Sequence, residues 1–393
     1  MANNKKFIFT LLLILLGTTG IAPMESSVLV IPDGVDDQIE IQAAFEQYKS
    51  VKLAEGIFST SAPIIMPSGS KLVGSGSKTI LMPAAAITVI QSQPGNSHIK
   101  ISNLTIDGNW VDSYITAMYF RENNYVDLIS ISVINSSHMG VFFEDSSYNN
   151  IRDSRFVNNG SIGGDSALWF SRGERNSILR NSFIGNQNGS CSQGANYTRV
   201  LFNYYEANNF DAVNLTYAGG DKPHSQGFLI AHNIIKGPSQ PGTQGIHLNR
   251  MENGKVFRNK ISGVGGHGIA LDYSNYVKVR WNDISNTGWS GIVLYNQGDY
   301  GASYNLIEDN SVYQVSLTEV DVSGIDIGNA YCNYNKVIGN TIRKGNSPFQ
   351  RFGIRIQSGA AYNEILGNDI RDGYLDLPIL DDGIGTIIEG NKW

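Results

Sequence analysis

The sequence predicts an all-β protein, a solenoid of stacked parallel strands with one short helix at its N-terminal end. A motif consisting of an apolar residue, two spacers, Asn, one spacer and another apolar residue returns about every 22 to 30 residues. The 43 Gly and the low charged fraction of 16% favour short strands and tight turns over helices. Such strands cannot bury an apolar face alone, so successive coils must stack. The motif places its asparagines at Asn181, Asn233, Asn259, Asn282, Asn310, Asn340, Asn368 and Asn391.

The repeated asparagine has a structural role in this prediction. Asn tolerates left-handed backbone at a bend, and its amide can bond both its own turn and the Asn one coil away, about 4.8 Å along the axis. We therefore expect a ladder of asparagines that holds the coils together and takes no part in catalysis.

The N-terminus has the order of a secretory signal peptide. Lys5 and Lys6 precede an apolar run at 7–16 and then small residues, which predicts a signal at 1–24. The alternative is a buried N-terminal strand. The run is too short to span a bilayer comfortably, and no other stretch is apolar enough. We expect a mature chain without a membrane span, secreted or at the cell surface.

The region 25–95 is predicted to hold a cap and the first strands. Asp36 or Asp37 can cap a short helix whose apolar stripe includes Ile39 and Ala43, and this helix would plug the open end of the solenoid. About twelve regular coils are expected over 96–393, closed by the coil of Trp393. The first strands are expected at 51–53, 56–58, 64–66 and 71–74.

Charge and cysteine content exclude several classes. A net charge of −6 argues against nucleic acid, which needs a basic face. Cys191 and Cys332 lie some five coils apart, too far for a disulfide, so two unpaired thiols are expected. Six scattered His and two distant Cys offer no ligand spacing for a transition metal. Calcium is possible, since exposed oxygen ligands abound. A monomer is expected.

Three segments carry a resemblance to a known family. They read DGVDDQIEIQAAF, GIFSTSAPIIMPSGSKLVGSG and ISNLTIDGN, and the asparagine coils follow them. This order resembles the pectate-lyase-like right-handed parallel β-helix superfamily. Within it, the chain looks like exported β-helix proteins of methanogenic archaea related to disaggregatase, which degrades the cell-envelope heteropolysaccharide. The resemblance implies a right-handed parallel β-helix and an extracellular polysaccharide as partner, but this fold hosts many activities.

The catalytic signatures of that superfamily do not transfer to this chain. Gly266-His267-Gly268 and Arg355-Ile356-Gln357 echo polygalacturonases, and Asn209-Phe210-Asp211 does so loosely, but no Asp-Asp precedes them in a matching coil. The segment 139–145 lacks the Tyr, Asp and His of alginate epimerases. His267 is therefore interpreted as a turn residue.

A second repeat, Gly-apolar-x-apolar, points to a candidate site. Its apolar residues face the core, so the middle residue faces solvent, and the middle residues of successive coils form a column. Aromatic and charged side chains there suit a groove for a sugar chain, although an ordinary exposed sheet remains the alternative. The column contains Phe142, Trp169, Asn214, His247, Ala270, Val293, Asp326 and Arg355. A parallel column contains Glu144, Ser171, Thr216, Asn249, Asp272, Tyr295, Gly328 and Gln357.

These columns supply the candidate site residues of a carbohydrate-active enzyme. The residues expected to act in catalysis are His247, Asp272, Tyr295, Asp326 and Arg355, and those expected to bind the sugar are Trp169, Asn214, Lys222, Asn249, Arg250 and Gln357. Asp272 and Asp326 lie two or more coils apart, roughly 10 Å, which favours inverting hydrolysis. β-Elimination would instead use Lys222, Arg250, Arg355, Tyr295 or His247.

Three questions stay open on the sequence alone. The reaction is hydrolysis or β-elimination of an acidic or amino-sugar-containing polysaccharide, and the alternative is a non-catalytic surface or matrix protein. The segment 186–225 is expected to be the longest interruption of the coils, either walling the groove or simply solvated.

Overall fold

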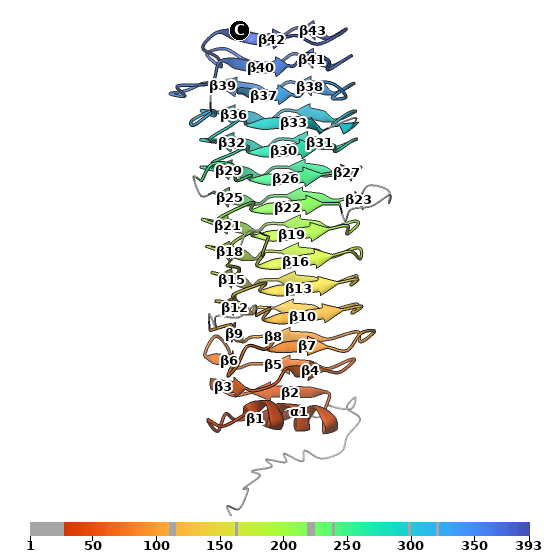
Figure 1. Cartoon of the computed structure of the whole chain (residues 1–393), viewed down its shortest axis with the longest axis vertical. Helices are drawn as coiled ribbons and strands as arrows, with labels where there is room; N and C mark the ends of the chain where they lie inside the picture. Colours follow the sequence, from red (N-terminus) through yellow and green to blue (C-terminus); the bar gives the residue numbers. More distant parts are fainter. Residues whose placement is uncertain are drawn as a thin grey trace, which may run out of the picture.

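The computed structural model describes residues 27–109, 115–161, 164–217, 225–237, 240–297, 300–319 and 322–393. Over this part the chain winds into a right-handed parallel β-solenoid of about 13 turns, which confirms the predicted fold class. Figure 1 shows the strands stacked as rungs along one axis, with α1 at one end and the C-terminus at the other. The predicted signal at 1–24 lies outside the described residues.

The described strands form three large parallel sheets, in which each coil contributes a strand to each sheet in turn. The 15-stranded sheet contains, in spatial order, β1 (Ser27–Val30), β2 (Ser50–Leu53), β5 (Lys71–Val73), β8 (Lys100–Ser102), β11 (Asp127–Ile129), β14 (Asn150–Arg152), β17 (Ser177–Leu179), β20 (Arg199–Leu201), β24 (Leu229–Ala231), β28 (Lys255–Phe257), β31 (Lys278–Arg280), β35 (Leu306–Glu308), β38 (Lys336–Ile338), β41 (Glu364–Leu366) and β43 (Ile387–Glu389).

The 14-stranded sheet carries the candidate site. It contains β4 (Ile64–Met66), β7 (Ile90–Ser92), β10 (Met118–Arg121), β13 (Val141–Glu144), β16 (Leu168–Ser171), β19 (Ser190–Gln193), β22 (Val213–Thr216), β26 (Ile246–Asn249), β30 (Ile269–Asp272), β33 (Ile292–Gln297), β37 (Ser323–Ile327), β40 (Phe352–Ile356) and β42 (Leu377–Asp381), with β34 (Tyr300–Gly301) antiparallel to β33.

The 12-stranded sheet completes each coil. It contains β3 (Gly56–Thr60), β6 (Thr79–Pro83), β9 (Thr105–Asp107), β12 (Ser132–Ile134), β15 (Arg155–Val157), β18 (Ser182–Ile184), β21 (Tyr204–Glu206), β25 (Ile234–Lys236), β29 (Lys260–Ser262), β32 (Asp283–Ser285), β36 (Ser311–Tyr313) and β39 (Thr341–Arg343). A separate pair joins β23 (Ser225–Gln226) to β27 (Met251–Glu252). All four predicted first strands are present, as β2 to β5.

Identical inward positions stack along the axis and form one continuous core. Phe143 lies between Phe120 and Phe170, with ring centroids 5.0 and 4.8 Å apart. All three side chains are fully buried. Burial of one such side chain is worth about 1.5–3 kcal/mol, but only because the neighbouring coils cover it.

The asparagine ladder is present, and one detail of its prediction is wrong. Asn259 Nδ2 donates to Asn282 Oδ1 at 2.9 Å, and Asn282 Nδ2 donates to Asn310 Oδ1 at 2.9 Å. The left-handed residue, however, is the one before each ladder Asn, as at Arg258 (φ 53°) and Trp281 (φ 56°). The Asn itself turns its amide inward, where it satisfies buried backbone groups of the adjacent coils. Its benefit is therefore hydrogen bonding and not backbone freedom.

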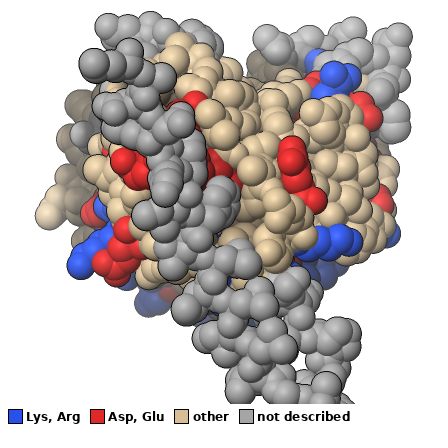
Figure 2. Space-filling model, turned by 90° about the horizontal axis from the view of Figure 1, so that it is seen from below, with Lys and Arg blue, Asp and Glu red and all other residues tan. Residues whose placement is uncertain are grey.

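The N-terminal end is capped by α1 (Asp37–Gln47), with Asp36 as its N-cap accepting from the Gln38 backbone at 3.4 Å. The helix was predicted, but its buried stripe was not. Ile41, Ala44 and Phe45 face the core, and Ile39 is 62% exposed. Figure 2 looks onto this end, where charged side chains are spread among mostly uncharged described residues.

The C-terminal end differs from the expectation of a closing coil. Ile388 is 36% exposed and Trp393 is 59% exposed, although Ile365 and Ile370, at the same positions one coil earlier, are fully buried. No described residue packs beyond β43 in its sheet, so the inward positions of the last coil have no next coil to cover them.

Over its described residues 186–217 the segment 186–225 is not the interruption that was expected, and 218–224 lie outside the described residues. β19, β20 and β21 form a regular coil whose residue at the ladder position is Asn203, and β22 begins the next coil. The apolar motif is weak here because Ser190 and Ser192 occupy buried positions of β19. Ser190 Oγ lies 2.7 Å from Tyr205 Oη, which supplies the hydrogen bond that a buried hydroxyl needs.

Both cysteines are free, as predicted, and both are buried. Cys191 lies in β19, whereas Cys332 follows β37, which is five steps away in the sheet. Among the described residues, no helix is long and apolar enough to cross a membrane.

Candidate functional site

The two predicted columns exist in register on the 14-stranded sheet. Asn214 pairs with His247 and His247 with Ala270, while Asn249 pairs with Asp272 and Asp272 with Tyr295. The coil at β19 adds Cys191 and Gln193, which the prediction omitted, between the rungs of Trp169 and Asn214. Strand alternation thus identified the outward positions correctly.

The expectation that the first column is open to solvent along its whole length is wrong. Ala270, Val293 and Asp326 are at most 2% exposed although they point away from the core. His267 and Trp289, from the turns before β30 and β33, pack with ring centroids 5.0 Å apart, and His267 packs against Tyr295 at 5.4 Å. Turn residues therefore form part of this side of the sheet.

Three side chains from successive coils form what we term the His247 cluster: Asp211, His247 and Asp272. His247 Nδ1 lies 3.1 Å from Asp211 Oδ2, and His247 Nε2 lies 2.9 Å from Asp272 Oδ2. Asn214 Nδ2 donates to Asp211 Oδ2 at 2.8 Å, and the Gln244 backbone donates to Asp211 Oδ1 at 2.9 Å. The imidazole is thus fixed between two carboxylates.

The two carboxylates determine the charge of His247. Burial alone would lower the pKa of His247, but the hydrogen bonds to Asp211 and Asp272 outweigh it and raise the pKa to about 10. Both ring nitrogens then donate, so the imidazolium has no proton left to share with a ligand. Asp272 Oδ1, by contrast, accepts no hydrogen bond from any described residue. This atom is itself buried, so a ligand could use it as an acceptor only after the side chains that cover it move.

Tyr295 stands one coil beyond Asp272 and is 37% exposed. Burial, together with the charges of Asp326 and Asp272, raises the pKa of Tyr295 to about 12, so the phenol keeps its proton at neutral pH. Its Oη lies 3.0 Å from His267 Nε2. Burial lowers the pKa of His267 to about 3, so this imidazole is neutral. A carboxylate acceptor and a phenol donor therefore stand on adjacent rungs.

Asp326 and Arg355 form a second, separate group. Arg355 Nε lies 3.1 Å from Asp326 Oδ2, its Nη2 also bonds Oδ2, and Gln357 Nε2 donates to Asp326 Oδ1 at 3.0 Å. Burial raises the pKa of Asp326, and the guanidinium of Arg355 opposes that rise. With both oxygens engaged and 2% exposure, Asp326 cannot contact a ligand unless Arg355 moves.

The remaining sequence-predicted residues are dispersed. Trp169 stands two rungs from Asn214 and extends an aromatic column formed by Tyr119 and Phe142, whose rings stack at 5.3 Å. Arg250 lies over the rings of Tyr217 and Tyr273, at the corner after β26. Asn249 is half-buried beside Asp272. Lys222 lies outside the described residues.

Sequence reasoning missed Asp211 and His267, although a signal for both was present. Each stands three residues before a residue of the first column, as does Gln244. These turn positions bond one another, since Gln244 N donates to Asp211 Oδ1 and His267 N donates to Gln244 Oε1 at 2.8 Å. A third polar column, read at this offset, would have brought Asp211 to His247.

No group of three or more His, Cys, Asp or Glu among the described residues could hold a metal ion. The His, Cys, Asp and Glu side chains of the described residues therefore do not form a donor set that fits a copper centre.

Two family profiles match parts of the chain. Residues 171–319 match the profile described as right handed beta helix region, and residues 85–222 match that of the periplasmic copper-binding protein NosD. Each covers less than half of the chain. No curated protein sequence matches it.

Solved structures with the same fold cover most of the chain. The mannuronan C-5 epimerase AlgE6 A-module of Azotobacter vinelandii has a TM-score of 0.65 and 18% identity, and covers 92% of this chain and 96% of its own. PfbA, a surface adhesin of Streptococcus pneumoniae, has a TM-score of 0.58 and 13% identity, and the match covers 90% of this chain and 89% of the PfbA chain. The catalytic domain of a GH87 alpha-1,3-glucanase has a TM-score of 0.54 and 13% identity, and the match covers 96% of this chain and 71% of the glucanase chain. At these identities the likeness shows the parallel β-helix fold alone.

Proposed function

We propose that this protein is an exported, monomeric carbohydrate-active enzyme that hydrolyses glycosidic bonds in a cell-envelope or extracellular polysaccharide. The observation that carries the proposal is the His247 cluster beside Tyr295. It holds one buried carboxylate oxygen without a hydrogen-bond partner, Asp272 Oδ1, which substrate would reach once the covering side chains move, and one protonated phenol on the next rung. The resemblance to disaggregatase-related proteins and the likeness to a glucanase domain support a polysaccharide substrate.

The geometry suggests distinct roles for these side chains. Asp272 Oδ1 would accept a proton from the attacking water as general base, and Tyr295 would donate its phenol proton to the departing sugar oxygen. His247, held by Asp211, is a positioning residue, because both its nitrogens bond carboxylates. Trp169, Phe142 and Tyr119 would provide an aromatic surface for neighbouring sugar units.

The local charge favours an amino or neutral sugar at the point of cleavage. In the His247 cluster two carboxylates, Asp211 and Asp272, hold one imidazolium, which leaves the cluster with one net negative charge. A uronate carboxylate would be repelled there. This argues for hydrolysis and against β-elimination, which needs a carboxylate at the reacting sugar.

A second candidate function is a non-catalytic surface protein that binds glycans. The observation in its favour is that both nitrogens of His247 and both oxygens of Asp326 already have hydrogen-bond partners within the chain. Networks of this kind also occur purely to stabilise a sheet. The fold shared with a surface adhesin is compatible with this candidate.

A polysaccharide panel separates these possibilities. The chain from residue 25 onward would be incubated with amino-sugar-containing, neutral and uronate polymers, and new reducing ends and the ultraviolet absorbance of unsaturated products followed together. Reducing ends without absorbance, lost in Asp272→Asn and retained in Asp283→Asn on the exposed face of β32, support the hydrolase. Both signals together indicate a lyase. Binding without either signal supports the non-catalytic protein.

A further inference from the structure

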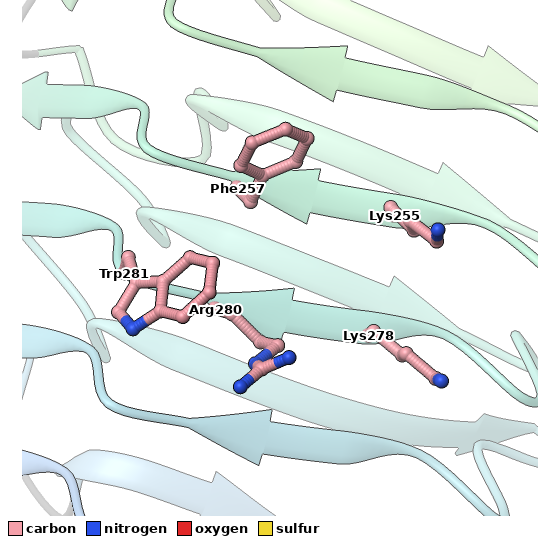
Figure 3. Close-up of a pocket in the computed structure, with 5 residues that line it drawn as sticks. All are labelled: Lys255, Phe257, Lys278, Arg280 and Trp281. Atoms are coloured by element: carbon pink, nitrogen blue, oxygen red, sulfur yellow. The ribbon is translucent and has the colours of Figure 1, made fainter.

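A hollow of about 230 Å³ lies on the 15-stranded sheet, across β28 and β31, and contains none of the candidate catalytic residues. We term it the Lys255 hollow and define it by its lining residues Lys255, Phe257, Lys278, Arg280 and Trp281. In Figure 3 Phe257 and Trp281 lie at one end of the hollow, and the two lysine side chains lie at the other. Its volume is suited to a single sugar ring.

The two lysines form an unfavourable pair in the absence of an anion. Lys255 and Lys278 are direct neighbours in register, about 4.8 Å apart along the axis. Like charges at such positions destabilise a sheet. Neither has a carboxylate within 4.0 Å among the described residues, whereas Lys336, in the same column on β38, pairs with Glu364 at 2.9 Å. An anion between Lys255 and Lys278 would relieve their repulsion.

The other end of the hollow is a fixed aromatic and cationic wall. The Arg280 guanidinium lies 4.3 Å from the centroid of the Trp281 ring, and that of Arg258 lies 5.3 Å from it. Arg280 Nε is also 2.6 Å from Glu308 Oε2, so its position is held from two sides. Trp281 is 44% exposed. The hollow therefore combines an exposed aromatic edge with positive charge.

We propose that the Lys255 hollow is a non-catalytic binding site for an acidic sugar unit, whose carboxylate lies between the ammonium groups of Lys255 and Lys278 while its ring contacts Phe257 and Trp281. The proposal rests on the proposed function in one respect: the sugar belongs to the polysaccharide that the His247 cluster cleaves. The acidic units of such a polymer would bind in the positive hollow and not at the negative His247 cluster. Two sheets of the solenoid would then bind one polysaccharide molecule.

Charge complementarity favours this ligand over larger polyanions. Of the four cations Lys255, Lys278, Arg258 and Arg280, only Arg280 has a carboxylate within 4.0 Å among the described residues, that of Glu308, but the chain as a whole carries a net charge of −6. A long duplex or an anionic membrane would meet that overall negative field, whereas one sugar carboxylate meets only the local one.

Binding is tested in the Asp272→Asn chain, so that turnover does not affect the result. Affinity for polygalacturonate would be measured by affinity electrophoresis and by calorimetry at low and high salt. The double variant Lys255→Gln/Lys278→Gln is expected to weaken binding about tenfold and to reduce its salt dependence. The matched control Lys336→Gln removes an equal type of charge from the same column outside the hollow, and should bind as the parent does.

Three results would overturn the proposal: unchanged affinity in the double variant, an equal loss towards carboxyl-reduced polygalacturonate, or stronger binding of a DNA duplex or of phosphatidylserine vesicles than of the polyuronate. Failure of the proposed hydrolysis is a separate result. If no polysaccharide is cleaved but the double variant still loses affinity, the hollow remains a glycan-binding site and only the catalytic role of the His247 cluster falls.

Discussion

The His247 cluster and the Asp326–Arg355 pair occupy the same sheet and the same outward columns, two coils apart, yet they hold their carboxylates differently. In the first, an imidazolium engages one oxygen of Asp272 and leaves Oδ1 buried without a hydrogen-bond partner. In the second, Arg355 and Gln357 engage both oxygens of a buried Asp326. The difference teaches that an outward position on a β-solenoid does not by itself make a carboxylate reactive. The hydrogen-bond partners on the adjacent rungs decide whether a carboxylate keeps an unpartnered oxygen or has both oxygens engaged in structural contacts.

The largest expected effect is on turnover. Asp272→Asn removes the unpartnered acceptor and should lower kcat on the order of 10³-fold, within the range for general base catalysis, and it should also lower stability because His247 loses one of its two carboxylate partners. Reducing-end assays and thermal unfolding measure the two effects. A larger loss of kcat in a stably folded Asp326→Asn would reverse the roles that we give the two groups.

The next effect is on stability. Asp326→Asn leaves the half-buried Arg355 cation without its carboxylate, and should lower the free energy of unfolding by about 3 kcal/mol in urea titrations. The double variant Asp326→Leu/Arg355→Met should recover most of this loss, because no charge is then left unpaired. Asp376→Asn, which breaks the exposed pair with Arg351, is the control and should cost less than about 1 kcal/mol.

Tyr295→Phe tests the proton donor with a nearly isosteric change. Loss of the hydroxyl should lower kcat about 10²-fold and leave KM nearly unchanged. The basic limb of the pH–rate profile, which reflects the raised pKa of Tyr295, should change its position. Full activity in this variant would exclude Tyr295 as the donor.

A further expected effect is a pH dependence of stability that distinguishes the two histidines. The pKa of His247 is raised in the folded state, so its contribution is complete below about pH 6.5 and is lost as the pH rises through about 10. The pKa of His267 is lowered, so its contribution is present above about pH 6.5 and is lost as the pH falls towards 3. Urea titrations across this range should show His247→Gln flattening only the alkaline limb. If the alkaline limb of the stability–pH curve is unchanged in His247→Gln, His247 is not charged in the folded protein at neutral pH.

Much of the fold could be predicted because it follows from local repeats. The repeated asparagine motif and the Gly-apolar-x-apolar repeat identify coil spacing, core positions and outward columns. The capping residue Asp36 marks the start of α1. The coil containing β19 escaped prediction because Ser190 and Ser192 break its apolar pattern. Their burial is explained by hydroxyl partners within the same coil, Tyr205 for Ser190 and Thr198 for Ser192.

The candidate site was predicted only in part. The outward columns placed His247 beside Asp272, but not Asp211, since a turn residue 36 positions earlier reaches His247 only after the coils have stacked. The same holds for His267 against Tyr295, and for the Lys255 hollow, whose residues are spread over two coils.

The solenoid fold and the outward positions follow from the sequence alone, because strand alternation and coil period are properties of neighbouring residues along the chain. The folded molecule is needed to show which outward carboxylate oxygen lacks a hydrogen-bond partner, which histidine is charged and where the basic hollow lies. Those properties depend on contacts between coils, where burial and partner charges from distant segments set the energy of each group.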